Sequence, residues 1–345
     1  MVNKHKYVTF SKNVFIPVTN ICRNRCYYCG FRRDIRDEDA FLLNFDEVEE
    51  ILRRGREKGC SEALFTFGEY PEAVEGFKEI LEEEGYESFI EYVRDLCERA
   101  LDIGMLPHTN PGSISFEELK ILKDVNASMG LMLESTARLK AHEKSPGKDP
   151  QIRIRTIEDA GKLKIPFTTG ILVGIGERRE DRRRSLEVIR DLYEKYGHIQ
   201  EVIIQNFVPK RETKMENYRA LPMDELVETV SLAREILPKE IAIQIPSNLV
   251  PLEMIPEMMR CGANDLGGIS PITPDHINPE SKWPSEEDLR EILGDLFLLK
   301  ERFPIYPAFI CERKDGLEKN DGWYSERISN LIERYADDDG FKREG

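Results

Sequence analysis

The sequence predicts an α/β fold, a TIM-type (β/α)8 barrel with a C-terminal extension. Short apolar runs of strand character alternate with segments of helical periodicity along most of the 345 residues. Eight such alternations suit a closed parallel barrel, and the chain exceeds the roughly 250 residues that this fold commonly takes. The expected strands are 14–19, 63–67, 105–109, 127–133, 167–173, 201–207, 241–245 and 265–269.

The helical segments between these runs complete the predicted architecture. No Pro-, Gly- or Ser-rich linker and no internal repeat divides the chain, so we expect one domain over residues 1–345. Its core would cover about 10–303, and the extension, about 304–345, would cap the barrel. The expected helices are 45–58, 88–101, 152–164, 182–196, 224–236 and 286–302.

Composition and charge narrow the class of function. Apolar residues make up 40% of the chain, as in a globular protein, and the net charge is −15. Nucleic-acid-binding proteins are usually basic, so we expect a small-molecule substrate. No run approaches the roughly 18 apolar residues of a membrane span, and the N-terminus has no secretion-signal pattern. Seven cysteines without disulfide-like pairing fit a reducing, cytoplasmic environment.

Three cysteines lie within eight residues directly after the first expected strand: Cys22-Arg-Asn-Arg-Cys26-Tyr-Tyr-Cys29. Three thiolates from one loop can bind three irons of a 4Fe-4S cluster, and without a nearby fourth cysteine one iron stays open. A structural zinc site is the alternative. Zinc prefers four ligands, commonly from two separated cysteine pairs, and a remote His or Cys would have to complete the set here.

With Tyr28 directly before its third cysteine, this loop resembles that of the radical S-adenosylmethionine (SAM) enzymes. The resemblance implies a barrel of the radical SAM kind, with an open cluster iron that binds the amino and carboxylate groups of SAM. It also implies that one electron from the cluster cleaves SAM to methionine and a 5'-deoxyadenosyl radical. The protein would then contribute positioning and the exclusion of water.

Two further motifs follow in the family's order. Gly68-Glu69 ends the second expected strand, and the resemblance implies that it holds the SAM ammonium, which a carboxylate can pair. Gly170-Ile-Leu-Val-Gly174-Ile-Gly-Glu177 is similar to the family's GxIxGxxE pattern, with leucine in the isoleucine place. We therefore expect Gly170, Gly174 and Glu177 to contact the cofactor.

An acid and an arginine complete the expected SAM site. Glu134 ends the fourth apolar run, where a buried carboxyl needs a specific partner, and related enzymes use an acid here to contact SAM. Arg155 resembles the arginine that pairs with the SAM carboxylate, because its planar fork matches that group. Arg153 is the competing candidate.

The later segments resemble the small subunits of 7,8-didemethyl-8-hydroxy-5-deazariboflavin (FO) synthase. The likeness extends from about residue 15 to about 304 and includes the segments 145–148, 204–207, 243–249 and 262–276. It implies a carbon–nitrogen lyase of deazaflavin and coenzyme F420 biosynthesis. Its substrate would be the tyrosine–diaminouracil adduct 5-amino-5-(4-hydroxybenzyl)-6-(D-ribitylimino)-5,6-dihydrouracil, which it would cyclise with loss of ammonia.

Polar residues at several expected strand ends are candidates for substrate contacts. Amides and acids gather there, as binding of a uracil-like ring and ribityl hydroxyls would require. The residues do not reveal which group acts as acid or base. The candidates are His108, Gln205, Asn206, Asn248 and Asp265.

The resemblance also implies partners and leaves rivals. The partner radical SAM subunit would supply the adduct, and a ferredoxin or flavodoxin would be the one-electron donor. That adduct-forming subunit is the closest alternative function, and hydrogenase-maturase-type enzymes are another. A biotin synthase would need three more cysteines inside the barrel, and a simple electron carrier a complete cysteine shell and a smaller body. The remaining cysteines are Cys60, Cys97, Cys261 and Cys311.

Overall fold

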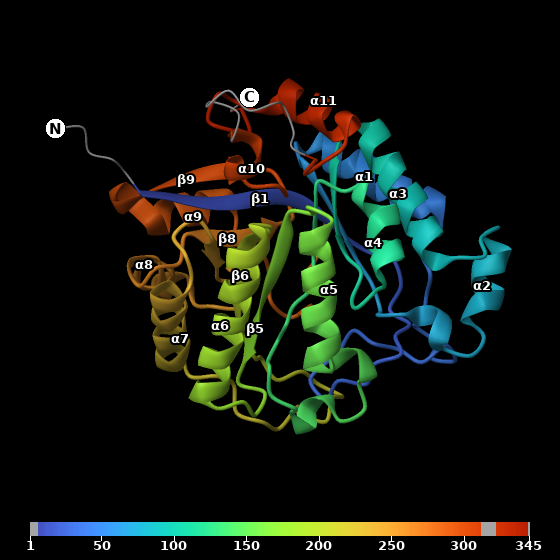
Figure 1. The fold of residues 1–345 in the computed structure, drawn as a ribbon, viewed down its shortest axis with the longest axis horizontal. Helices are drawn as coiled ribbons and strands as arrows, with labels where there is room; N and C mark the ends of the chain where they lie inside the picture. The colour runs from blue at the N-terminus through green and yellow to red at the C-terminus, as the bar shows by residue number, and fades with distance from the viewer. Residues whose placement is uncertain (1–5, 312–321, 344–345) are drawn as a thin grey trace.

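The computed structural model describes residues 6–311 and 322–343, and its central element is a closed parallel barrel (Figure 1). Strands β2 to β8 follow one another in chain order, and β1 pairs with both β8 and β2 to close the ring. A ninth strand, β9, pairs with the first half of β1. The strands are β1 Lys6–Pro17, β2 Glu62–Thr66, β3 Leu106–Asn110, β4 Ser128–Gly130, β5 Phe167–Val173, β6 Ile199–Asn206, β7 Ala242–Gln244, β8 Asp265–Ile269 and β9 Phe297–Arg302.

Helices surround the barrel and pack their apolar faces onto it (Figure 1). The α-helices are α1 Phe45–Glu57, α2 Phe77–Glu83, α3 Phe89–Ile103, α4 Phe116–Lys123, α5 Pro150–Lys162, α6 Arg179–Tyr196, α7 Met223–Ile236, α8 Ile255–Arg260, α9 Glu286–Leu293, α10 Pro307–Cys311 and α11 Glu326–Tyr335. The short 3-10 helices are η1 Pro71–Ala73, η2 Lys140–His142, η3 Pro146–Lys148, η4 Leu252–Met254 and η5 Gly294–Leu296. The predicted (β/α)8 barrel is confirmed, with all eight expected strands in place.

The predicted helix over 286–302 is wrong in its second half. Helix α9 ends at Leu293, and Gly294 follows with a φ of 52°, a conformation that breaks the helix. From Phe297 the side chains alternate between the core and solvent, which is the period of a strand. This strand, β9, pairs with residues 6–11 of β1, so β1 also begins earlier than expected.

The C-terminal elements lie at the amino ends of the barrel strands, opposite the loop that follows β1 (Figure 1). The carbonyl of Pro304 accepts hydrogen bonds from Ser128 Oγ at 2.6 Å and Gln200 Nε2 at 2.8 Å, which belong to the first residues of β4 and β6. The segment after β9 thus closes one end of the barrel. Its division from the core at about residue 303 stays a prediction.

Arg302 is the charged centre of this closed end. Its guanidinium donates to both carboxylate oxygens of Asp265, at 2.6 and 3.0 Å, and to Glu201 at 3.2 Å. All three side chains are at most 5% exposed. Burial alone would raise the pKa of Asp265, but Arg302 outweighs it and keeps that pKa below its ordinary value.

No helix within these described ranges combines the length and apolar character needed to cross a membrane.

We expect Arg302→Met to lower the free energy of unfolding by about 3–5 kcal/mol, because it leaves buried carboxyl groups without their cation. Chemical denaturation measures this loss. The matched control is Arg290→Met, which breaks an exposed i,i+4 pair with Glu286 and should cost less than about 1 kcal/mol. Equal losses in the two variants would contradict the structural role given to Arg302.

Candidate active site

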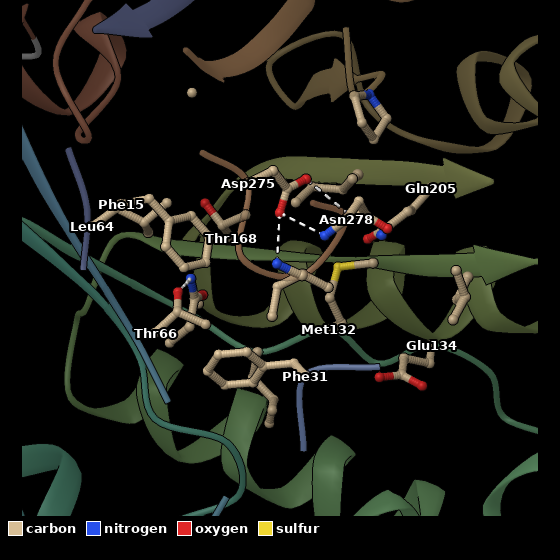
Figure 2. A pocket seen from close by; sticks show the side chains of 18 of the residues that line it. Phe15, Phe31, Leu64, Thr66, Met132, Glu134, Thr168, Gln205, Asp275 and Asn278 are labelled. Carbon is tan, nitrogen blue, oxygen red and sulfur yellow. Dashed lines mark hydrogen bonds between the residues drawn. The ribbon is translucent and has the colours of Figure 1, made fainter. Parts of the chain in front are cut away.

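A cavity of about 410 Å³ runs through the barrel from the cysteine loop to the closed end. Cys22, Cys26 and Cys29 line it at one end, and Arg302 and Pro304 line it at the other. Figure 2 shows part of this lining, with Glu134 and Gln205 toward the tips of the strands and Thr168, Leu64 and Phe15 deeper in the barrel. The position at the carboxyl ends of the strands is where barrel enzymes place their chemistry.

The cysteine loop lies between β1 and α1 and is fixed at its base. Thr19 pairs with Leu42 in an antiparallel bridge, and the Asn20 side chain donates to the carbonyl of Asp39 at 2.8 Å. The other four cysteines do not line the cavity. Two of them, Cys60 and Cys97, are buried in the hydrophobic core.

The end of β2 holds one side of this loop. Gly68 donates its main-chain N–H to Thr19, while Glu69 donates to Cys22 Sγ at 3.2 Å and accepts from the Arg23 N–H at 3.1 Å. A Cβ at Gly68 would lie 2.0 Å from the Ile21 carbonyl oxygen and 2.8 Å from the Cys22 Cβ. Only glycine allows the loop to approach this closely.

The segment that includes η2 and η3 holds the other side. Tyr27 donates its main-chain N–H to Ala141 at 2.9 Å, and Arg25 donates to Ser145 Oγ at 3.1 Å. The Ser145 hydroxyl in turn donates to Cys26 Sγ at 3.2 Å. Two of the three sulfurs therefore already accept hydrogen bonds, and such bonds stabilise a metal-bound thiolate.

Burial opposes ionisation of two of the three thiols. Burial, with the nearby thiols and Glu69 adding to it, raises the pKa of Cys22 to about 12, and burial raises that of Cys26 to about 11. Binding of iron by these two groups as thiolates would therefore release protons. Within the described part of the chain, no group of three His, Cys, Asp or Glu side chains forms a site for a single metal ion. Three thiols line the cavity at this end, one fewer than the four ligands of a structural zinc site.

Glu69 and Arg153 form a buried ion pair beside the cysteine loop. Arg153 Nη2 lies 3.2 Å from Glu69 Oε2, and Arg23 Nη2 lies 3.0 Å from Glu69 Oε1. Burial would raise the pKa of Glu69, but Arg153 and Lys148 outweigh it and hold that pKa below its ordinary value. The carboxylate therefore stays ionised.

The structure does not bring Arg155 to this site, where the competing candidate Arg153 lies. Arg153 is 2% exposed and lines the cavity, whereas Arg155 is exposed. Both residues are on α5. Side chains two positions apart in a helix point about 200° apart around its axis, so Arg153 and Arg155 face opposite sides.

Glu134 lies in a second polar group on the cavity wall. Its carboxylate accepts hydrogen bonds from Tyr28 Oη and from Lys148 Nζ, and it lies 2.9 Å from His142 Nε2. Burial opposes ionisation, but Lys148 and His142 outweigh it and hold the pKa of Glu134 well below its ordinary value. The predicted partner of this buried acid is thus Lys148, with Tyr28 and His142 beside it.

The motif over residues 170–177, which begins on β5, has one residue in the cavity lining. Glu177 accepts from the main-chain N–H groups of Gly174 and Ile175 at 2.8 and 2.9 Å, and from Arg182 Nε at 2.8 Å. It therefore fixes the turn between β5 and α6. Leu172 is the residue of this motif that lines the cavity. The structure does not place Gly170, Gly174 or Glu177 in the lining.

The predicted substrate residues divide between two places. His108, Gln205, Asn206 and Asn248 line the cavity, and Asn248 Nδ2 donates to Asp275 Oδ2 at 2.8 Å. Asp265 does not line it. It is the first residue of β8, at the amino end of the barrel, where it pairs with Arg302.

Several lining residues escaped the sequence analysis, which had no means of assigning a role to them. Lys148 and Asp275 belong to the segments 145–148 and 262–276, which the sequence analysis named only for their family resemblance and without a role for either residue. The acids on β2 and β6 belong to the amino ends of their strands, where no chemistry was expected. The residues missed are Asn24, Phe31, Arg32, Glu62, Met132, Lys148, Glu201, Asp275, Asn278 and Arg302.

Comparison with known proteins gives a consistent result. The family model described as the radical SAM superfamily matches residues 16–189. Curated relatives called 7,8-didemethyl-8-hydroxy-5-deazariboflavin synthase are similar over almost the whole chain. That of Methanococcoides burtonii is 54% identical, with 98% of each chain covered. That of Archaeoglobus fulgidus is 53% identical, with 98% of this chain and 99% of the relative covered.

Solved structures share the fold at low identity. Methylornithine synthase covers 95% of this chain and 81% of its own, with a TM-score of 0.60 and 19% identity. The FeFe-hydrogenase maturase of Carboxydothermus hydrogenoformans covers 85% of this chain and 68% of its own, with a TM-score of 0.65 and 18% identity.

We expect Gly68→Ala to reduce iron loading after anaerobic reconstitution to less than about half that of the wild type, because its Cβ would push the loop off β2. Iron and sulfide analysis measures the loading. Gly85→Ala is the control: its positive φ strains an alanine there, but no atom lies near its Cβ and it does not line the cavity. Full loading of Gly68→Ala would show that the close contact does not position the cysteines.

Proposed function

The chain belongs to the radical SAM superfamily and, within it, to the 7,8-didemethyl-8-hydroxy-5-deazariboflavin (FO) synthases, and from this we propose that it catalyses the ring-closing half of FO formation. The reaction would convert the tyrosine–diaminouracil adduct to FO and release ammonia, 5'-deoxyadenosine and methionine. One observation carries this proposal: the three-cysteine loop opens onto a deep barrel cavity with polar groups along its length.

We assign the cluster to Cys22, Cys26 and Cys29. The chemistry of these donors fits a 4Fe-4S cluster, since they offer three thiols, hydrogen-bond donors to two of the sulfurs, and no fourth cysteine in the lining. Bound there, the cluster and SAM would supply the 5'-deoxyadenosyl radical. The protein's own task is to hold both groups and to keep water from the cavity.

The charged residues beside the loop support binding of an amino acid moiety. Glu69 is ionised and can accept from an ammonium group, and Arg153 fixes its orientation. Lys148 and Arg153 also place buried positive charge where a carboxylate would be stabilised. We therefore propose that this end of the cavity takes the methionyl part of SAM.

Further parts of the proposal concern partners. The partner radical SAM subunit would provide the adduct, a ferredoxin or flavodoxin would reduce the cluster, and the work would take place in the cytoplasm. The adduct-forming subunit remains the rival function. A biotin synthase finds no support, because among the described residues the cysteines that line the cavity are the three of the loop.

Turnover distinguishes the two halves of FO synthesis. Reduced, reconstituted enzyme given SAM and the adduct should yield a fluorescent deazaflavin, with 5'-deoxyadenosine and ammonia in equal amounts. Chromatography with fluorescence detection follows the product. If the enzyme instead consumed free tyrosine and the ribityl-diaminouracil, the assignment to the ring-closing half would be wrong.

The roles of the two arginines on α5 can be separated by substitution. Arg153→Ala should weaken SAM binding about tenfold or more, because Glu69 loses a charge-assisted bond that holds it, worth about 1.5–3 kcal/mol. Equilibrium dialysis with reconstituted protein measures the affinity. Arg155→Ala is the matched control on the exposed side and should bind SAM as the wild type does. A loss in Arg155→Ala alone would refute this assignment.

A further inference from the structure

The floor of the cavity is a ring of polar side chains at the amino ends of the strands. Glu62 on β2, His108 on β3, Thr168 on β5 and Glu201 on β6 all line the cavity there, together with Arg302 from β9. Each is between 3% and 6% exposed. Because the floor is closed by the C-terminal segment, these groups face the cavity and not bulk solvent.

The floor has more carboxyl groups than cations. Arg302 is shared by Asp265 and Glu201, and no basic side chain among the described residues forms an ion pair with Glu62. Burial raises the pKa of Glu62 and raises that of Glu201 to about 7, with Arg302 offsetting only part of it. Thr168 Oγ1 donates to Glu201 Oε2 at 2.8 Å, and each carboxyl oxygen can still accept a further hydrogen bond from a ligand.

His108 adds a neutral imidazole to the floor. Burial lowers its pKa to about 4, so the ring has one N–H donor and one acceptor nitrogen. Its Nδ1 lies 2.7 Å from Ser128 Oγ, and its Nε2 lies 3.4 Å from Asn110 Oδ1. A hydroxyl group of a ligand can pair with either form of Nε2, because a hydroxyl both donates and accepts.

A collar without charges separates the floor from the cysteine loop. Phe15, Leu64, Gly130 and Ile203 line the cavity at this level, and Figure 2 shows Phe15 and Leu64, which are register partners on β1 and β2, side by side in the deep part. On β2, Glu62 at the floor and Thr66 at the carboxyl end of the strand both line the cavity and are four residues apart, which is about 13 Å of strand. The cavity can thus hold a ring at the collar with a chain below it.

We propose that this floor, with the carboxyl groups of Glu62 and Glu201 and the imidazole of His108, is the subsite for the polyhydroxylated chain of the substrate. The inference rests on the proposed function, since it concerns the ribityl group of the FO precursor. A hydroxyl chain brings several donors into an acceptor-rich floor, whereas a phosphate would meet two carboxyl groups of like charge. The flat ring would then lie in the collar, between the hydroxyl chain and the cysteine loop.

The test compares two ligands by equilibrium binding to the reconstituted enzyme. One is FO, and the other is the same deazaflavin with a methyl group in place of the ribityl chain. Intrinsic fluorescence of the ligands allows titration without turnover. Wild type should bind FO at least about tenfold more tightly, as expected when hydrogen bonds to buried acceptors are lost.

Substitutions in the floor test whether these residues cause the preference for FO over the methyl analogue. Glu62→Gln and His108→Phe should each reduce the ratio of the two affinities at least about threefold, with the affinity for the methyl analogue unchanged within about twofold. Glu301→Gln is the control: it makes the same change as Glu62→Gln at a carboxyl group outside the cavity, which pairs with Lys342. Its ratio should equal that of the wild type, and SAM cleavage confirms that each variant is loaded.

The outcomes separate this inference from the proposed function. If wild type binds FO and the analogue equally, or if the variants weaken both ligands alike, the subsite is refuted while FO synthesis still stands. If wild type binds neither ligand and makes no deazaflavin from the adduct, the proposed function fails and the subsite fails with it.

Discussion

The close contact between the cysteine loop and the end of β2 is the constraint on which the site depends. Gly68 has no side chain, so the loop main chain can rest on it, and the next residue, Glu69, bonds to Cys22 and Arg23 through its main chain. The Glu69 carboxylate then ties Arg23 to Arg153 on α5. A buried carboxylate is costly unless paired, and here both oxygens are paired. Gly68 and Glu69 therefore fix the cysteine loop, the end of β2 and helix α5 relative to one another.

The two ends of the cavity have opposite charge balances. Near the cysteines, the cations Arg23, Lys148 and Arg153 accompany only two buried acids, Glu69 and Glu134. At the floor the balance reverses, because Arg302 pairs with two carboxyl groups, Asp265 and Glu201, and Glu62 adds a third buried carboxyl group. Such a gradient orients an elongated occupant, since an anionic group is favoured at the loop and hydrogen-bond donors are favoured at the floor. The uncharged collar lies between these two charged ends of the cavity.

The sequence predicted the barrel well because strand–helix alternation is a property of local patterns. It predicted the cysteine loop for the same reason, since all three ligands are within eight residues. The sequence did not predict features that depend on the direction of a side chain or on contacts between distant residues. Arg153 and Arg155 are on the same helix and differ in the side that they face. Asp265 was expected near the carboxyl end of its strand, but it is the first residue of β8. The segment 297–302 has apolar residues that suit helix or strand, and pairing with β1 decided the matter.

The deep cavity depends on glycines in the strands, and their role becomes clear only from the structure. Barrel interiors are usually filled by layers of bulky branched side chains. Here inward positions are glycine: a Cβ at Gly130 would lie 2.3 Å from Asn110 Oδ1, and one at Gly268 would lie 2.0 Å from Asn13 Nδ2. These glycines leave room for polar side chains from neighbouring strands, which would otherwise be displaced. A glycine within a strand normally weakens it, so its presence at two inner positions indicates that the space itself is needed. The open interior is thus a built feature of this barrel, and it joins the cysteine loop to a floor that only the C-terminal segment completes.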